Sequence, residues 1–361
     1  MKGNKGEWSE VYTFLKLLGD GVIYAGNENL ERINSIFYPL VSVIREESDG
    51  KYFYKSESNI NIINSEGKKL LEVSRSQFIE KAKELFNLLK ISKGSSFNFP
   101  EIEGFLKQIY VEKLKSASGN KRDITIVVHD LNTNTTPTLG FSIKSRLGGN
   151  STLLNPGEST NFIYEVETLD NNYTTEDLMN TVNNIKTRSK IKDRTKFLIS
   201  NKVILKFSGI QSENLYLNLQ MIDSLLPEIL SQLLLYYYSG QSASIKELVE
   251  ILEESNPIAF NQSKHHKFYE YKIKNFLTDV ALGMTPQRSW TGHYDATGGY
   301  LIVKEDGDIV CYHIYNRNEF QEYLLNNTLL DTPSSSRYKF GEVYKENNKY
   351  YYKLNLQIRF K

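Results

Sequence analysis

The chain has 361 residues, of which 40% are hydrophobic and 24% charged, a composition typical of a globular protein long enough for two domains. Its 44 Lys and Arg nearly balance 43 Asp and Glu, and a net charge of +1 argues against a nucleic-acid partner unless the charges are unevenly placed. The single cysteine, Cys311, excludes an internal disulfide framework and a cysteine-based zinc cluster. We find no apolar signal region and no run approaching about 18 apolar residues, so we expect a cytoplasmic protein.

The N-terminal part of the chain is expected to be largely helical. The spacing of Trp8, Val11, Leu15 and Leu18 predicts an amphipathic helix over residues 7–18, ended by glycines. Similar patterns predict further helices at 30–45, 74–90 and 105–115, with a β-rich segment at 52–63.

The rest of the chain alternates strands and helices and then becomes mainly β. Strands are predicted at 124–129, 139–145, 161–167 and 196–206, helices from about 175 and at 224–238, 244–254 and 268–284, and further strands at 300–304, 309–315, 338–344 and 350–360. This order predicts an α/β fold in which helices flank a mixed central sheet, with a β-rich C-terminal region. A soft segment near residue 240 divides a catalytic core, 1–240, from a recognition region, 241–361.

The strands at 124–129 and 139–145 are predicted to form an antiparallel hairpin around a polar turn. If the turn centre lies between residues 133 and 134, Asp123 faces Lys144 and Thr125 faces Ser142. Side chains alternate along each strand, so one face of the hairpin is entirely apolar and the other is polar. A slip by one residue would destroy this pattern on both strands.

An aspartate and a lysine on one sheet face suit metal-dependent cleavage of a phosphodiester bond. The carboxylate of Asp123 can hold Mg²⁺, which prefers oxygen ligands and activates bound water. The ammonium group of Lys144 can orient that water and offset negative charge on the phosphate. The alternative is an Asp–Lys pair that only stabilises the hairpin.

Asp123 at a strand start, followed by a hairpin with Lys144, resembles the core of the PD-(D/E)XK nucleases. Longer strings resemble the HpaII-type restriction endonuclease family. They are GNKGEWSEVYTFLKLL near the start, GFSIKSRLG at 140–148, STLLN at 151–155, TNFIY at 160–164 and YYYKLNLQIRF at 350–360. The resemblance therefore extends over nearly the whole chain.

The resemblance implies a type II restriction endonuclease that uses Mg²⁺ to cut both strands of DNA at a short palindrome such as CCGG, leaving 5′-phosphate ends. It also implies a cognate methyltransferase as genetic partner, and either a homodimer on DNA or sequential action of a monomer. The alternatives are a non-cleaving DNA-binding protein and a repair or junction-resolving nuclease on the same core.

Ser142 departs from the superfamily pattern, which has an acidic residue two positions before the lysine. A hydroxyl is a poorer Mg²⁺ ligand than a carboxylate, so a second acid is expected from elsewhere. The resemblance points to the first helix, where Glu7 and Glu10 share one face, and Glu10 is the predicted second ligand. The alternative for both is an exposed helix surface near the positive end of the helix dipole.

Basic residues are unevenly distributed, which removes the objection raised by the net charge. They alternate from Lys186 to Lys196 as in an edge strand or extended loop, where they would contact DNA phosphates or protect the edge of a sheet. A second cluster, 113–122, leads directly to Asp123. The predicted DNA-binding residues are Lys121, Arg122, Arg146, Lys186, Arg188, Lys190, Arg288 and Arg337, each of which could instead be an ordinary surface residue.

Overall fold

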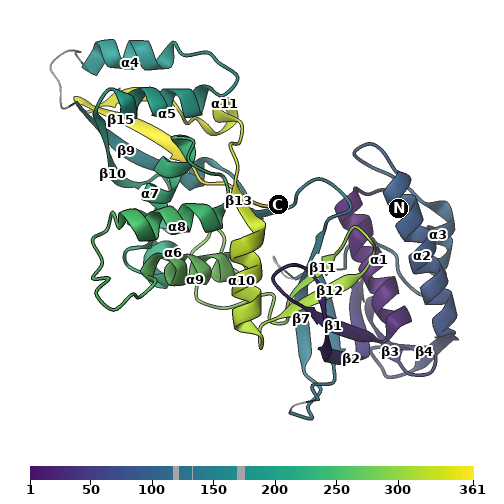
Figure 1. Cartoon of the computed structure of the whole chain (residues 1–361). Helices are drawn as coiled ribbons and strands as arrows, with labels where there is room; N and C mark the ends of the chain where they lie inside the picture. Colours follow the sequence, from purple (N-terminus) through teal and green to yellow (C-terminus); the bar gives the residue numbers. More distant parts are fainter. Residues whose placement is uncertain (117–121, 132, 169–174) are drawn as a thin grey trace. The chain divides into compact units, whose positions relative to one another are not determined.

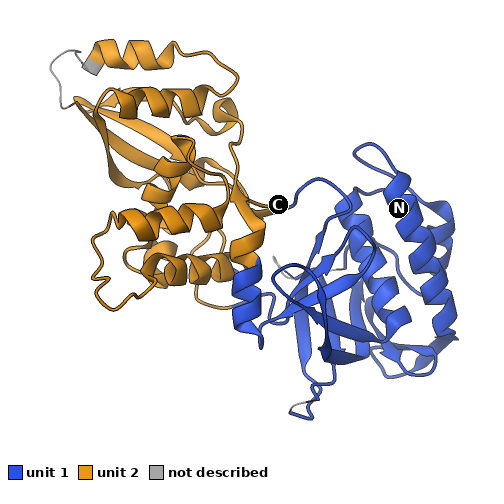
Figure 2. Ribbon diagram, in the orientation of Figure 1, with its two compact units in different colours: residues 1–151, 281–283, 294–323 blue, residues 152–280, 284–293, 324–361 orange. Residues whose placement is uncertain are grey.

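The computed structural model describes residues 1–116, 122–131, 133–168 and 175–361. These residues form two compact units (Figure 2). Unit 1 comprises Met1–Ser151, Ala281–Gly283 and Tyr294–Tyr323, and unit 2 comprises Thr152–Val280, Met284–His293 and Leu324–Lys361. The predicted boundary between a catalytic core and a recognition region, at residue 240, falls within unit 2 and stays a prediction about function.

The described part of unit 1 is built on a nine-stranded mixed sheet in the order β1-β12-β11-β7-β6-β2-β3-β4-β5. β1 also pairs with β2, so the first six of these strands close into a barrel. The strands are β1 (Val22–Gly26), β2 (Arg32–Glu47), β3 (Gly50–Ser56), β4 (Ile60–Asn64), β5 (Lys69–Val73), β6 (Ile124–Val128), β7 (Thr138–Ser145), β11 (Gly299–Val303) and β12 (Ile309–His313). The mixed α/β class is confirmed, whereas closure of the sheet was not predicted.

Three helices of unit 1 lie near one another in Figure 1: α1 (Lys5–Asp20), α2 (Arg75–Ile91) and α3 (Pro100–Gln108). α1 follows the predicted pattern, since Trp8, Val11, Leu15 and Leu18 are all fully buried. They pack in one apolar cluster with the inward side chains of β6 and β7. The N-terminal helix of the prediction is therefore confirmed, and it is packed next to the hairpin.

The helix predicted at residues 30–45 is wrong, because this segment is strand β2. Its buried positions follow a two-residue period from Tyr38 to Ser42 and change parity at Val43, next to an irregularity in the pairing with β6 between Leu40 and Ser42. Pro39 lies in the middle, where a helix would lose a hydrogen bond. The bulge obscured the strand periodicity and produced the false helical spacing.

The predicted hairpin exists, but its register differs by two residues. Thr125 pairs with Gly140 and not with Ser142, and Ile124 pairs with Phe141. A bridge between Asp130 and Thr135 closes the turn one residue earlier than expected. A shift of two keeps every side chain on its predicted face. The apolar face is accordingly buried, while Asp123 lies opposite Ser142 and not opposite Lys144.

Unit 2 contains two small antiparallel sheets among its described residues, in the orders β10-β9-β15-β14 and β13-β16-β8. The strands are β8 (Thr152–Leu154), β9 (Asn161–Thr168), β10 (Val203–Ile210), β13 (Thr328–Leu330), β14 (Val343–Glu346), β15 (Lys349–Asn355) and β16 (Ile358–Phe360). The helices are α4 (Thr175–Asn183), α5 (Lys190–Ser200), α6 (Glu213–Ile222), α7 (Leu226–Tyr238), α8 (Ile245–Ser255) and α11 (Ser335–Tyr338). α9 (Phe268–Leu282) and α10 (Arg317–Asn327) each contribute residues to both units.

The basic segment from Lys186 to Lys196 was predicted as an edge strand or loop, and this prediction is wrong for most of it. Residues from Lys190 onward form helix α5, which buries Ile191, Arg194 and Leu198 at helical spacing. The alternating charges hid this face because Arg194, one of the basic residues, belongs to the buried side. Only the part before Lys190 remains outside a helix.

Other predictions near the ends of elements also need correction. The helix predicted at 105–115 ends at Gln108, so Lys113 and Lys115 lie in a loop. The strand predicted at 338–344 is present only at its end, because helix α11 ends at Tyr338 and β14 begins at Val343. The C-terminal region is less β-rich than predicted, since it includes α8 to α11, and its first two strands, β11 and β12, belong to the sheet of unit 1. No helix in the described residues is long and apolar enough to span a membrane.

Candidate active site

Asp123 is fixed immediately before β6 by hydrogen bonds to β7. Its backbone N–H donates to the carbonyl of Phe141 over 2.8 Å. Its carboxylate Oδ2 accepts two hydrogen bonds, from the Ser142 hydroxyl at 3.0 Å and from the backbone N–H of Ile143 at 2.7 Å. Ser142 is 2% exposed. The residue at the unusual position of the motif therefore orients the aspartate.

Lys144 lies two residues beyond Ser142 on the same face of β7. Its Nζ is 5.3 Å from the centre of the Tyr300 ring, which β11 places beside β7. Burial lowers the pKa of Lys144, and the negative charges of Asp123 and Glu10 offset only part of that effect. An ammonium group with a lowered pKa can exchange a proton more readily near neutral pH than an exposed lysine.

Glu10 is presented by α1 and is a second carboxylate of this region. Burial, followed by the negative charge of Asp123, raises the pKa of Glu10 to about 8, although Lys115 opposes the shift. Lys115 Nζ lies 3.8 Å from Glu10 Oε1. The negative charge of Asp123 thus acts on Glu10, and a shared role of the two acids in metal binding stays a prediction.

Glu7, the other predicted acid of the first helix, takes part in the cap of α1. Its side chain accepts the backbone N–H of Asn4 at 2.8 Å, and the Asn4 side chain accepts the backbone N–H of Glu7 at 3.0 Å. This reciprocal pair is a capping box, which satisfies backbone donors at the helix start. A catalytic role for Glu7 stays a prediction, whereas its role in the cap is observed.

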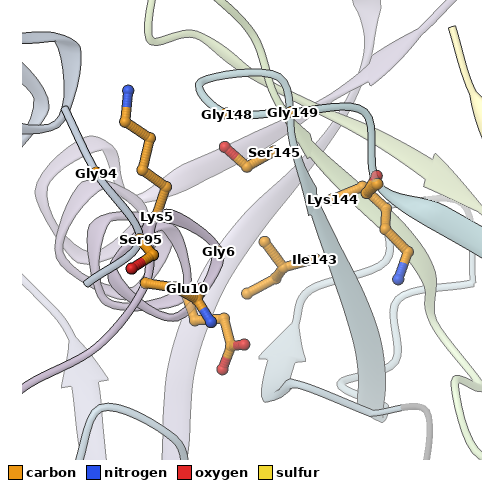
Figure 3. Close-up of a pocket in the computed structure, with 12 residues that line it drawn as sticks. Lys5, Gly6, Glu10, Gly94, Ser95, Ile143, Lys144, Ser145, Gly148 and Gly149 are labelled. Atoms are coloured by element: carbon orange, nitrogen blue, oxygen red, sulfur yellow. The ribbon is translucent and has the colours of Figure 1, made fainter. Parts of the chain in front are cut away.

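A cavity of about 350 Å³ opens beside these residues (Figure 3). Glu10, Lys144 and the glycine pair Gly148–Gly149 belong to its lining. In Figure 3, Ile143 and Lys144 leave β7 on opposite sides, and Glu10 lies on the side of Ile143. The cavity therefore adjoins the end of β7, where residues from both faces of the strand are accessible.

Asp123 and Glu10, of which Glu10 lines the cavity, are ligands of the kind that a magnesium ion takes. No group of three or more His, Cys, Asp or Glu that could hold a metal is found among the described residues. Mg²⁺, however, is usually held by one or two carboxylates and completes its shell with water and substrate phosphate oxygens. Asp123 and Glu10 supply two carboxylates; burial and then the charge of Asp123 raise the pKa of Glu10, and a cation would offset both effects.

Among the described residues, two of the predicted DNA-binding residues, Arg122 and Arg146, belong to unit 1. Lys121 lies outside the described residues. Arg122 directly precedes Asp123 and packs its side chain against Gly140, where a Cβ would come within 2.3 Å of the Arg122 Cδ. Arg146 follows β7, and its backbone N–H donates to Val303 at 2.9 Å. Arg122 and Arg146 thus flank the hairpin that carries Asp123 and Lys144.

The other five predicted DNA-binding residues belong to unit 2. Lys186 and Arg188 precede α5, and both are exposed. Arg188 and Lys190 line a cavity of about 500 Å³ together with residues 331–336. Arg337 follows this loop and is exposed, with its guanidinium group 5.4 Å from the Tyr338 ring centre. Arg288 is also exposed but does not line this cavity.

Sequence reasoning missed several charged residues that the fold brings to these places. Lys115 was part of a basic cluster but was not singled out, and its contact with Glu10 depends on a loop that no local pattern predicts. Lys190 also borders a second cavity, of about 420 Å³, with Lys339 and Lys353. These two lysines lie more than 140 positions further along the chain. Only knowledge of the strand pairing could have found them.

Comparison with known proteins gives two matches over nearly the full length. Residues 4–360 match the family model described as HpaII restriction endonuclease. The type II restriction enzyme HpaII of Haemophilus parainfluenzae is 44% identical over 360 residues, which is 99% of this chain and 98% of that protein. No solved structure matches.

Proposed function

The chain belongs to the HpaII restriction endonuclease family and is a type II restriction endonuclease, and we propose on this premise that it cuts both strands of duplex DNA at a short palindrome of the CCGG type. The products would carry 5′-phosphate ends. The single observation that carries the assignment of the chemistry is the β6–β7 hairpin, on which Asp123, Ser142 and Lys144 share one face.

Asp123 and Glu10 are the residues that would hold Mg²⁺. When bound, the cation polarises the scissile phosphate and lowers the pKa of its water. Asp123 is preorganised for this role, because Ser142 and the Ile143 amide fix one of its oxygens and leave the other, Oδ1, to face a ligand. Glu10 supplies the acid that the motif lacks at position 142. Burial and the charge of Asp123 raise the pKa of Glu10 to about 8, so a cation beside the two carboxylates would favour the ionised form of Glu10.

Lys144 would act on the attacking water and on the phosphate. Its lowered pKa favours proton exchange, and its charge offsets the negative charge that develops as the phosphorus–oxygen bond forms. The ring of Tyr300 lies beside the ammonium group, with its centre 5.3 Å from Lys144 Nζ. The hairpin would thus position the water-activating group relative to Asp123 without any loop movement.

The exposed basic residues of unit 2 would supply phosphate contacts, and Arg122 and Arg146 would contact DNA beside the scissile bond. A palindrome contains two equivalent bonds, one in each strand. Cutting both requires two active sites of a homodimer or two successive events by one monomer, and sedimentation of the enzyme with its target duplex would separate these. The proposal also includes a cognate methyltransferase as the genetic partner that protects host DNA.

Digestion of a supercoiled plasmid with Mg²⁺ tests the function. A restriction endonuclease gives discrete fragments, which disappear when the target cytosines are methylated. A junction-resolving nuclease would nick branched DNA and leave the plasmid without discrete fragments. A non-cleaving DNA-binding protein would shift the DNA in a gel and leave it intact, and either result would overturn the proposal.

A further inference from the structure

Lys115 lies in the loop after α3, beside the proposed metal ligands, and has no assigned role. We propose that Lys115 is a positioning residue that pairs with Glu10 in the DNA-free enzyme and moves to the scissile phosphate when a divalent cation takes its place. The inference rests on the proposed function, because it assumes that Glu10 and Asp123 hold a cation. It adds a second lysine to the site and assigns it the DNA phosphate as ligand.

The contact between Lys115 and Glu10 is of the kind that a cation can displace. Their nearest charged atoms are 3.8 Å apart, which is the limit of direct pairing. The side chain of Lys115 is 61% exposed, while that of Glu10 is 14% exposed. An exposed lysine at this distance gains little from its partner and loses little on leaving it. A divalent cation beside Glu10 would in addition repel the ammonium group.

The backbone that carries Lys115 is held much more firmly than its side chain. Arg45 Nη2 donates to the carbonyl of Lys113 at 2.7 Å, and Arg45 Nε pairs with Glu47 Oε1 at 2.9 Å. The side chains of Arg45 and Glu47 are 5% and 0% exposed. Glu47 also accepts the backbone N–H of Glu112 at 3.2 Å. This buried ion pair of β2 fixes the loop from which Lys115 extends.

A second hydrogen bond holds the other side of Lys115. The backbone N–H of Glu46 donates to the Ser116 hydroxyl at 2.9 Å. Lys115 is therefore a long, exposed cationic side chain on a backbone that is held in place, next to the Glu10 carboxylate. A lysine cannot ligate a metal ion as an ammonium group, but it binds phosphate well as a point charge. Once a cation neutralises the carboxylates, the DNA phosphate that reaches them is the nearest remaining anion.

The test compares Lys115→Met and Lys115→Arg with a matched control, Lys107→Met, which removes an exposed lysine of α3. Titration of Mn²⁺ into the DNA-free enzyme measures the competition directly. We expect Mn²⁺ to bind Lys115→Met about twofold to fivefold more tightly than the wild type, as loss of a weak ion pair implies. Lys115→Arg and Lys107→Met should bind Mn²⁺ as the wild type does.

The salt dependence of DNA binding measures the phosphate contact. A target duplex with a non-hydrolysable linkage at the scissile bond is used in the presence of Mn²⁺. The quantity measured is the slope of the logarithm of the DNA association constant against the logarithm of the salt concentration. For Lys115→Met this slope should become less negative by about 0.9 per site, whereas Lys115→Arg should keep the wild-type slope. An unchanged Mn²⁺ affinity or an unchanged slope for Lys115→Met overturns the inference.

Asp123→Asn separates the inference from the proposed function. If this variant binds Mn²⁺ as tightly as the wild type, the proposed metal site is wrong and the inference falls with it. If Asp123→Asn loses Mn²⁺ binding but Lys115→Met keeps the wild-type Mn²⁺ affinity, the inference alone is wrong. Thermal unfolding of each variant checks that the substitutions leave the fold intact.

Discussion

Unit 1 and unit 2 differ in how they hold their charged side chains. In unit 1, the charged side chains of the candidate site and of the loop beside it have defined partners: Asp123 accepts two hydrogen bonds, Glu10 faces Lys115, and Arg45 and Glu47 form a buried pair. In unit 2, Lys186 and Arg188 are exposed at the start of a helix. The difference suggests that unit 1 performs hydrolysis, which needs fixed geometry, while unit 2 supplies affinity, which needs accessible charge.

The largest effect is expected from Lys144→Met in unit 1. Removing the ammonium group takes away both proton exchange and charge compensation, so the single-turnover cleavage rate should fall by about 10³-fold. DNA affinity should change little, because the proposed role of the half-buried Lys144 is in the reaction and not in binding. Rapid-quench cleavage of a target duplex, with affinity measured in parallel, checks both. Equal losses of cleavage rate and DNA affinity would contradict the assignment of hydrolysis to unit 1 and of affinity to unit 2.

Unit 1 should also lose stability in acid, because the buried side chain of His313 cannot take up a proton in the folded state as readily as in the unfolded chain. Burial lowers the pKa of His313 to about 4, so between that value and its ordinary pKa of 6.5 the unfolded chain binds the proton and the folded chain does not. Stability is therefore complete above pH 6.5 and falls as the pH decreases toward 4, by about 3 kcal/mol in total. Urea unfolding of His313→Phe at several pH values should lack this component.

The control for that prediction is His266→Ala, an exposed histidine whose loss should leave the pH dependence of the wild type unchanged. A wild-type and a His313→Phe profile with the same slope between pH 4 and 6.5 would contradict the role of His313.

In unit 2, the triple substitution of Lys186, Arg188 and Lys190 by alanine should weaken DNA binding by about tenfold. The slope of the logarithm of the association constant against the logarithm of the salt concentration should become less negative by about 2.7. The single-turnover rate at saturating DNA should stay at the wild-type value, since none of these residues lies at the hairpin. Fluorescence anisotropy at several salt concentrations and rapid-quench kinetics give the two quantities. A loss of rate at saturation would assign unit 2 a part in the chemistry.

The smallest effect is expected for Glu7→Ala, which removes half of the capping box of α1. It should lower the free energy of unfolding by about 1 kcal/mol and leave cleavage of the folded enzyme near the wild-type rate. Glu10→Ala, three residues further on, is the matched comparison and should reduce the cleavage rate strongly. If Glu7→Ala and Glu10→Ala both cleave normally, the second acid does not come from this helix.

The local patterns predicted the elements that depend on nearest neighbours. Side-chain alternation and spacing predicted the two faces of the hairpin, the first helix and the common face of Asp123 and Lys144. A shift of two residues in the register does not disturb these predictions. The patterns failed where a long-range contact decides. β2 was misread because a bulge interrupts its period, and Arg194 looked like a DNA contact although it is buried and donates to Gly341 over 2.6 Å.

Contacts of the candidate site between residues far apart in the sequence could not be predicted from local patterns for the same reason. Tyr300 reaches Lys144 only because β11 pairs in parallel with β7, and Lys115 reaches Glu10 only because Arg45 holds its loop. No spacing in the chain encodes either contact. The Ser142 position was read as a missing ligand, and only the structure showed its hydrogen bond to Asp123.

The most direct test of the central claim is sequencing of the DNA ends produced by the wild type and by Asp123→Asn in the presence of Mg²⁺. The claim that Asp123 on the β6–β7 hairpin is required for cleavage at a specific palindrome predicts 5′-phosphate ends at one target sequence for the wild type and almost none for the variant, which still binds the target. Ends of the same position and yield from Asp123→Asn would contradict it.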